Sequence, residues 1–195
     1  QTRTWTYTWN AEDRLTRATT PHGEEWTYAY DPLGRRTSKT GPDGTALTFA
    51  WDGTRLAEQT THDGTTTTWE YAPGTHRPLS QSTHRIPEAV PGTDRPLAPL
   101  AETTSQPEYD ARFHAIVTDL VGTPTELVTP DGTLAWQPRA TVWGTPLPAQ
   151  PGETDCPLRF PGQYADSETG LNYNLFRYYD PETARYLTPD PLGPG

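Results

Sequence analysis

Aromatic and polar residues alternate in four short stretches of the first 80 residues. The aromatic or apolar positions are Trp5, Tyr7 and Trp9; Trp26, Tyr28 and Tyr30; Leu47, Phe49 and Trp51; and Trp69 and Tyr71. A period of two places these side chains on one face of a β-strand. The pattern therefore predicts four short strands, each with one face directed toward a core.

The four stretches recur at a regular interval. Their last aromatic residues, Trp9, Tyr30, Trp51 and Tyr71, are 21, 21 and 20 residues apart. A turn signal and a more polar strand follow each stretch, and the units close on glycine turns such as Asp43-Gly44, which is typical of tight hairpins. Four consecutive copies indicate a repeat architecture. We therefore predict an all-β chain, a meander of short antiparallel hairpins.

The meander pattern stops after residue 81 and returns near residue 110. Residues 82–109 are rich in proline and poor in large apolar groups, which predicts an exposed loop or linker, with a partner-binding polyproline II segment as the alternative. Further strands are expected at 113–117, 125–128 and 133–136. The chain thus divides into hairpin repeats at 1–81, a proline-rich loop or linker at 82–109, and a second β-rich region at 110–195.

The end of the chain, residues 170–195, is its most aromatic part. Residues 172–179 are predicted to form one short strand, because aromatic and apolar residues occupy both of its faces. The Asp-Pro-Glu-Thr sequence at 180–183 predicts a turn, and 185–188 a returning strand. The result would be a β-hairpin that carries charged side chains.

Two of the three charged residues considered in this stretch have more than one interpretation. Asp180 is expected to be a turn residue that bonds to the backbone ahead of it. Asp190 can be a similar turn residue or a functional carboxylate. Arg177 can stack between tyrosine rings, pair with Asp180, or serve a nearby carboxylate.

Composition supports a folded β-rich domain. The chain of 195 residues has 22 prolines, 16 glycines and only 32% hydrophobic residues, which alone would favour disorder. Seven tryptophans and ten tyrosines argue against disorder, because disordered chains are poor in aromatic residues. The net charge of −10 argues against nucleic-acid binding, which needs a basic surface.

Metal and thiol chemistry find little support in the sequence. Cys156 is the only cysteine, so no intrachain disulfide is expected, and we interpret it as a small buried thiol. The five histidines lack metal-ligand spacing, and His114 is expected to be a strand residue. We predict no metal and no cofactor. No apolar run is long enough for a membrane span or a signal peptide, and the absence of methionine leads us to expect a piece of a longer protein.

Two parts of the chain resemble one known family. Residues 170–193, GLNYNLFRYYDPETARYLTPDPLG, are similar to the core signature of RHS-repeat (YD-repeat) proteins, which include bacterial polymorphic toxins and the C subunits of insecticidal toxin complexes. Residues 30–36, YDPLGRR, match the YD repeat, and Asp119 to Pro124 resembles a phrase that precedes the core signature. By this resemblance, 110–195 is an RHS-associated core region.

The resemblance implies a specific architecture and setting. RHS repeats form a hollow, curled β-shell that encloses the C-terminal toxin or effector of the same polypeptide, and this chain would be the C-terminal part of such a shell. Its implied partners are the remainder of the shell, the enclosed toxin and a delivery apparatus, without nucleic acid. The implied location is that of a secreted or delivered bacterial effector.

The resemblance also implies a catalytic activity. In this family the core region is an aspartyl autoprotease that cuts the toxin from the shell. Asp190-Pro191-Leu192-Gly193 matches the first half of its D-P-x-G motif pair, and Arg177 matches an arginine placed near the aspartates. Two close carboxylates can share a proton and activate water, and a guanidinium can stabilise the negative charge. The catalytic residues we predict are Asp190 and Arg177. The chain lacks the second aspartate and the cleavage site, so we expect it to be inactive alone.

A different class of function is open. Clustered exposed tryptophans and acidic turns would also allow the chain to be a surface or glycan-binding β-repeat module, with the tryptophan rings stacked on sugars. The tryptophan and tyrosine stripes of this chain are otherwise interpreted as core and shell lining. The burial of the tryptophans separates the two interpretations.

Overall fold

The structure is a computed structural model that describes residues 4–85, 112–148 and 154–190. Its regular elements are fifteen β-strands in two sheets. The first sheet contains β1 (Thr6–Trp9), β2 (Leu15–Thr19), β3 (Glu25–Tyr30), β4 (Arg36–Thr40), β5 (Ala46–Asp52), β6 (Arg55–Thr61), β7 (Thr65–Tyr71), β8 (Pro78–Arg85), β9 (Phe113–Thr118), β10 (Pro124–Val128) and β11 (Leu134–Trp136). The second contains β12 (Tyr164–Asp166), β13 (Leu171–Asn174), β14 (Arg177–Asp180) and β15 (Arg185–Tyr186).

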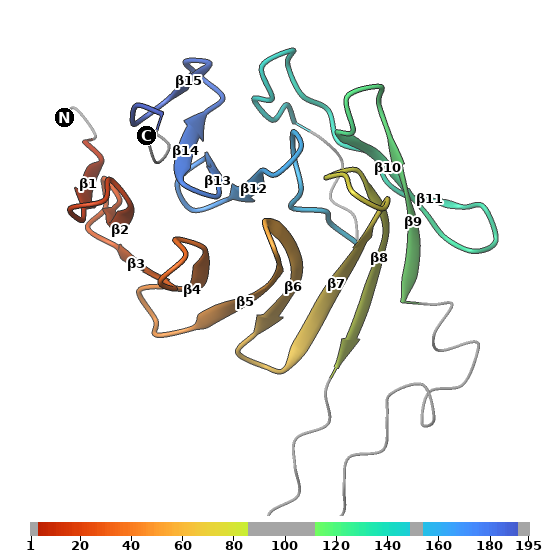
Figure 1. The fold of residues 1–195 in the computed structure, drawn as a ribbon, viewed down its shortest axis with the longest axis horizontal. Coiled ribbons are helices and arrows are strands. Elements are labelled where there is room, and N and C mark those ends of the chain that lie inside the picture. The colour runs from red at the N-terminus through yellow and green to blue at the C-terminus, as the bar shows by residue number, and fades with distance from the viewer. Residues whose placement is uncertain (1–3, 86–111, 149–153, 191–195) are drawn as a thin grey trace, which may run out of the picture.

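The first sheet is a long meander. Its eleven strands lie in the order of the sequence, and each pairs antiparallel with the next. The sheet curls, so that its first strands and its later strands lie on opposite sides of the second sheet (Figure 1). The predicted all-β meander is therefore confirmed, and the strands expected at 113–117, 125–128 and 133–136 correspond to β9, β10 and β11.

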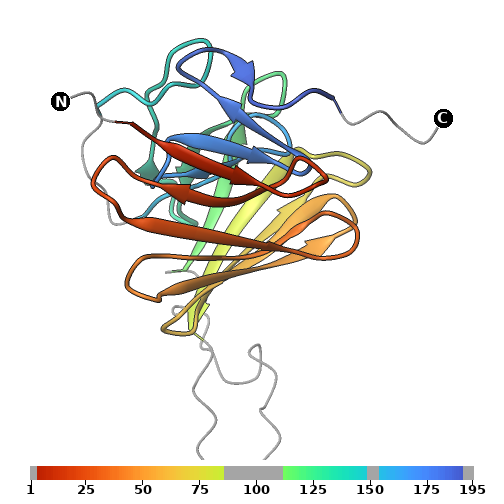
Figure 2. The same cartoon turned by 90° about the vertical axis from the view of Figure 1, so that its left-hand side faces the viewer.

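The second sheet lies within the curl of the first (Figure 1), and its strands run beside the first hairpin, β1–β2 (Figure 2). Two apolar clusters join the sheets. One contains Leu15, Ala18, Tyr28, Leu171, Tyr173 and Tyr178. The other contains Phe49, Leu56, Trp69, Ile116, Leu127, Cys156, Leu158 and Tyr164. The aromatic stripe predicted from the alternating pattern thus packs against residues 154–178, far away in the sequence, and this contact holds the second sheet in place.

The prediction of a single strand at residues 172–179 is wrong. The segment folds back on itself at Leu175 and Phe176, and Asn174 pairs with Arg177 across the turn. In one continuous strand Tyr173 and Tyr178 would point to opposite faces, because their separation is odd. In the hairpin they lie directly opposite each other, and both are almost fully buried. Burying both rings in one core explains the fold-back, and Leu175 accepts a φ of 53° to form the turn.

The first four residues of the predicted proline-rich loop, 82–85, belong to a strand of the first sheet. Strand β8 runs to Arg85, past residue 81, and pairs with β9. The meander therefore continues across the predicted insertion. Residues 86–109 of the proline-rich segment lie outside the described residues. In the described part of the chain, no helix is long and apolar enough to cross a membrane.

Candidate functional site

Arg177 and Asp190 lie next to each other in the structure. Arg177 begins β14, directly after the turn at Leu175 and Phe176, and Asp190 lies beyond β15. The Arg177 Nη2 atom is 2.9 Å from Asp190 Oδ1, which makes an ion pair. The side chain of Asp190 is 79% exposed and that of Arg177 is 21% exposed, so the carboxylate is open to solvent and the guanidinium is partly enclosed. The structure thus brings the two predicted catalytic residues together.

An aromatic platform lies under the guanidinium. The Arg177 Cζ atom is 3.6 Å from the centroid of the Tyr186 ring. The hydroxyl of Tyr186 accepts a hydrogen bond of 2.7 Å from Asn174 Nδ2. The rings of Tyr186 and Tyr179 meet at 64° with centroids 5.5 Å apart. Of the alternatives for Arg177, stacking on a tyrosine and pairing with a carboxylate both occur, and the carboxylate is that of Asp190.

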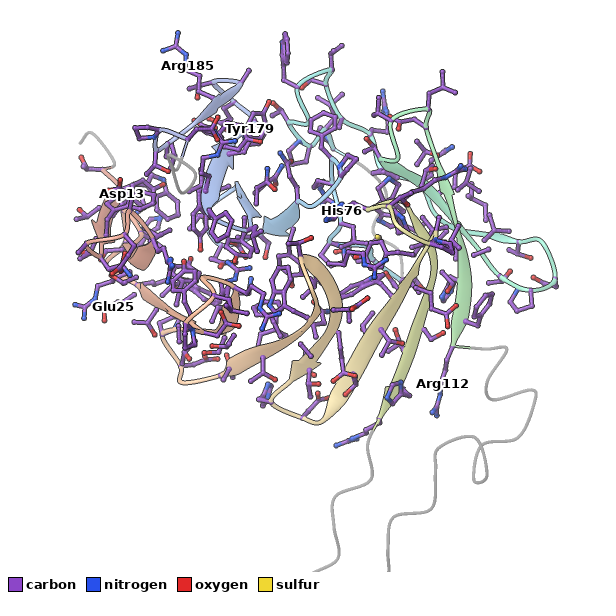
Figure 3. The ribbon with its side chains drawn as sticks, viewed as in Figure 1. Asp13, Glu25, His76, Arg112, Tyr179 and Arg185 are labelled. Atoms are coloured by element: carbon purple, nitrogen blue, oxygen red, sulfur yellow. The ribbon has the colours of Figure 1, made fainter. Side chains whose placement is uncertain are left out.

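Asp180 has the expected turn role. Its Oδ1 accepts a hydrogen bond from the Glu182 backbone N–H at 2.9 Å, and its Oδ2 accepts one from the Thr183 hydroxyl at 2.7 Å. These bonds close the turn between β14 and β15. Arg185, opposite Asp180 in the register, extends away from the molecule (Figure 3). Asp180 and Arg185, both on the β14–β15 hairpin, therefore offer matched controls for Asp190 and Arg177.

A second group of charged residues is buried where the two sheets meet. Arg36 on β4 donates to both oxygens of Asp166 on β12, at 2.6 and 2.9 Å. Lys39 Nζ donates to Asp166 at 3.1 Å and to Glu168 at 2.8 Å. The side chains of Arg36 and Asp166 are 1% and 0% exposed. We call these four residues the Arg36 cluster.

The Arg36 guanidinium also lies among aromatic rings. Its Cζ atom is 4.3 to 5.5 Å from the ring centroids of Tyr28, Phe49, Tyr164 and Tyr173. Its Nη1 atom lies 3.2 Å from the Tyr178 hydroxyl, which is 2.9 Å from the Tyr30 hydroxyl. Burial is the largest single effect and opposes ionisation of Asp166, but the charges and hydrogen bonds of Arg36 and Lys39 together outweigh it and lower the pKa of the carboxyl. The Arg36 cluster therefore joins β4 of the first sheet to the end of β12 in the second.

Sequence reasoning did not identify the Arg36 cluster or Tyr186 as parts of a site. Arg36 is the last residue of the YD match at 30–36, which was the available signal. Asp166 precedes a Ser-Glu-Thr-Gly sequence and carries no local sign of burial. Their contact spans 130 positions, and only the packing of the two sheets brings them together.

The remaining candidates are structural. Cys156 is fully buried within a core cluster, and burial raises the pKa of its thiol to about 12. His114 is 7% exposed on β9, and burial lowers the pKa of its imidazole. Among residues 4–85, 112–148 and 154–190, no three His, Cys, Asp or Glu side chains gather as a group that could hold a metal ion. Neither residue thus has the surroundings of a nucleophile or a metal ligand.

Comparison with known proteins relates the chain to one family. The family model described as RHS Repeat matches residues 9–46. The chain is 35% identical to double-stranded DNA deaminase toxin A of Burkholderia cenocepacia over 147 residues, and this match covers 73% of this chain and 10% of that protein. It is 55% identical over 73 residues to probable deoxyribonuclease RhsA of Dickeya dadantii, which is 37% of this chain and 5% of that protein. Toxin protein Tse5 of Pseudomonas aeruginosa is 47% identical over 87 residues, 44% of this chain and 6% of that protein.

Solved structures share the fold. The crystal structure of TcdB2-TccC3 superposes with a TM-score of 0.63 and 19% identity, over 97% of this chain and 9% of that one. The Tc holotoxin pore of Photorhabdus luminescens gives a TM-score of 0.64 and 16% identity, also over 97% and 9%. The chain thus spans about a tenth or less of the length of these relatives and solved chains.

Proposed function

The chain belongs to the RHS-repeat proteins, and we propose that it is part of a β-shell that encloses a toxin or effector segment of the same polypeptide. The curl of the eleven-stranded sheet and its likeness to a portion of TcdB2-TccC3 support this proposal. The partners are then the rest of the shell, the enclosed segment and a delivery apparatus. The intact protein would be a delivered bacterial effector, as the name of the relative Tse5, a toxin protein, also favours.

The second part of the proposal is that the intact protein releases this segment by aspartyl autoproteolysis. The observation that carries it is the ion pair of 2.9 Å between Arg177 and Asp190, the two residues that match the family motif. Asp190 and a second carboxylate further along the polypeptide would share one proton. The ionised carboxylate takes a proton from water, and the water oxygen attacks the scissile peptide carbonyl. The other carboxyl gives its proton to the departing nitrogen, which leaves a new carboxyl end and a new amine.

Arg177 has a defined part in this chemistry. Its guanidinium donates to Asp190 and keeps that carboxylate oriented toward the water that it activates. The 79% exposure of the Asp190 side chain leaves room for a second carboxylate and a peptide to approach. Arg177 is therefore assigned to orient the base and Asp190 to be one of the two reacting carboxylates.

The test is the intact mass and the N-terminal sequence of the full-length gene product. We expect two fragments from the wild type and from the control Asp180→Asn, and one uncut chain from Asp190→Asn. Arg177→Ala should slow cutting, whereas Arg185→Ala should not. Two fragments from Asp190→Asn would remove Asp190 from the mechanism, and one chain from the wild type would refute autoproteolysis.

Encapsulation has its own test. After cutting, the released segment should elute with the shell in size-exclusion chromatography and should resist added trypsin until the shell is unfolded. Enclosure would be refuted if trypsin digested the segment equally fast in the presence of the folded shell and after the shell is unfolded.

The glycan-binding alternative has weaker support. Of the seven tryptophans, all of which lie in the described residues, only Trp143 has a mostly exposed side chain, at 61%. Trp69 is fully buried, and Trp9, Trp26 and Trp51 pack against the core clusters. The tryptophan stripe is therefore part of the core, and one exposed ring does not make a row of sugar platforms.

A further inference from the structure

The ion pair between Arg177 and Asp190 needs a further support. Asp190 is largely exposed, and water weakens an exposed pair until it is worth little. A long arginine side chain at such a site would sample many rotamers unless a neighbour restrains it. Catalysis by positioned carboxylates needs a guanidinium with one orientation, because small displacements at a reacting group are costly in rate.

Tyr186 is placed to provide this restraint. The distance of 3.6 Å from Arg177 Cζ to its ring centroid is the shortest cation–ring contact among the described residues. The guanidinium uses its flat face for the stack, and its edge N–H groups remain free to donate to the carboxylate. One side chain can therefore meet both Tyr186 and Asp190 without competition between the two contacts.

The Tyr186 ring is itself held from two directions. Asn174, directly opposite Arg177 across the β13–β14 turn, donates to the Tyr186 hydroxyl at 2.7 Å. Tyr179 lies opposite Tyr186 in the β14–β15 register and packs against its ring at 5.5 Å. Tyr179 is anchored in turn, because its hydroxyl donates to the Trp143 carbonyl at 3.0 Å. Contacts from Tyr186 through Tyr179 to Trp143 thus connect the Arg177 side chain to the packed part of the molecule.

We propose that Tyr186 is a positioning residue for autoproteolysis, whose ring holds the Arg177 guanidinium in the orientation that engages Asp190. This inference rests on the proposed autoproteolytic function. It assigns to Tyr186 no contact with the scissile peptide, and its effect passes through Arg177.

The experiment compares three variants of the full-length protein. Cell-free synthesis with a labelled pulse and an unlabelled chase gives the rate of cutting for Tyr186→Phe, Tyr186→Leu and the control Phe176→Leu. Phe176 is an aromatic residue in the same hairpin region, and its exposure of 43% is close to the 37% of Tyr186. The control therefore reports the general cost of replacing a half-exposed ring there by leucine.

The expected results separate the ring from the hydroxyl. Tyr186→Leu should slow cutting by about 10-fold, which is the effect of losing a partly desolvated cation–ring contact. Tyr186→Phe keeps the ring and should cut within about twofold of the wild type, as should Phe176→Leu. Rescue by phenylalanine would exclude the hydroxyl bond as the important contact, and normal cutting by Phe176→Leu would exclude a general loss of hairpin stability.

Three outcomes would overturn the inference. The first is a Tyr186→Leu variant that cuts within about twofold of the wild type. The second is a Tyr186→Phe variant as slow as Tyr186→Leu, which would assign the effect to the hydroxyl. The third is equal slowing by Phe176→Leu. Asp190→Asn, measured alongside, separates the two levels: if it cuts normally the proposed function itself fails, and if it is blocked only the role of Tyr186 is in question.

Discussion

Replacing Asp166 by asparagine should destabilise the chain strongly. Asp166→Asn keeps the shape of the side chain but removes the charge that faces Arg36 and Lys39, and the Arg36 side chain is only 1% exposed. An unpaired buried charge of this kind costs about 3–5 kcal/mol. Domains are stable by about 5–15 kcal/mol, so the loss is a large part of the total. The Arg36 guanidinium lies against four aromatic rings, so it cannot turn to solvent without disturbing this core.

The assay is urea denaturation followed by tryptophan fluorescence. Trp51 is a suitable reporter, because its indole N–H donates to the Arg36 carbonyl at 2.8 Å. With a denaturant slope of about 2 kcal/mol per molar, the midpoint should fall by about 1.5–2.5 M. The matched control is Glu25→Gln, which breaks the ion pair with Arg17. The side chains of Arg17 and Glu25 are 52% and 46% exposed, so this change should lower the free energy of unfolding by at most about 1 kcal/mol. Equal losses from the two variants would refute the reasoning.

The pH dependence has a defined sign at the same site. The pKa of Asp166 is lowered in the folded state, so its contribution to the free energy of unfolding is present above its ordinary value of about 4 and is lost as the pH falls through the folded pKa. Asp166→Asn should therefore show a smaller further loss of stability below pH 4 than the wild type. A wild type and variant that lose stability in parallel there would contradict this assignment.

Three further predictions concern other residues. Gly34→Ala should lower the free energy of unfolding by about 1 kcal/mol more than Gly23→Ala, measured by urea denaturation. Both glycines have a φ near +85°, but of the two only Gly34 would place a new Cβ against side chains, with Arg14 Nη2 at 2.8 Å and Phe176 Cε1 at 2.9 Å. Equal losses from the two variants would contradict this contact. Burial lowers the pKa of His114, so on acidification the imidazole takes up a proton in the unfolded chain first, and stability should fall as the pH drops below about 6.5. His114→Gln should flatten the plot of stability against pH in this range. An unchanged plot would exclude His114 as the cause. Cys156 should react with a thiol reagent only as fast as the chain unfolds, because it is fully buried and its pKa is raised to about 12; immediate labelling of the native chain would show that the core is open there.

The sequence also located most of the candidate site. Resemblance to a motif points to Arg177 and Asp190, and Arg177 Nη2 lies 2.9 Å from Asp190 Oδ1. Asp180 was interpreted as a turn residue from the Asp-Pro pair, and it bonds to the turn as expected. Tyr186 was visible only as one tyrosine among many. Its role depends on the β14–β15 register, which no local pattern encodes.

The sequence alone determined the class of fold, because alternation of period two and regularly spaced turns are local properties that each hairpin satisfies by itself. It therefore predicted the hairpins on either side of the proline-rich segment, whereas the pairing of β8 with β9 across that segment was visible only in the structure. Only the tertiary structure decided how residues 154–190 pack. The fold-back at Leu175 occurs because Tyr173 and Tyr178 must share one core, and Arg36 is buried because Asp166 reaches it from 130 positions away. A buried charge is stable only with its partner in place, and that pairing exists only when the two sheets meet.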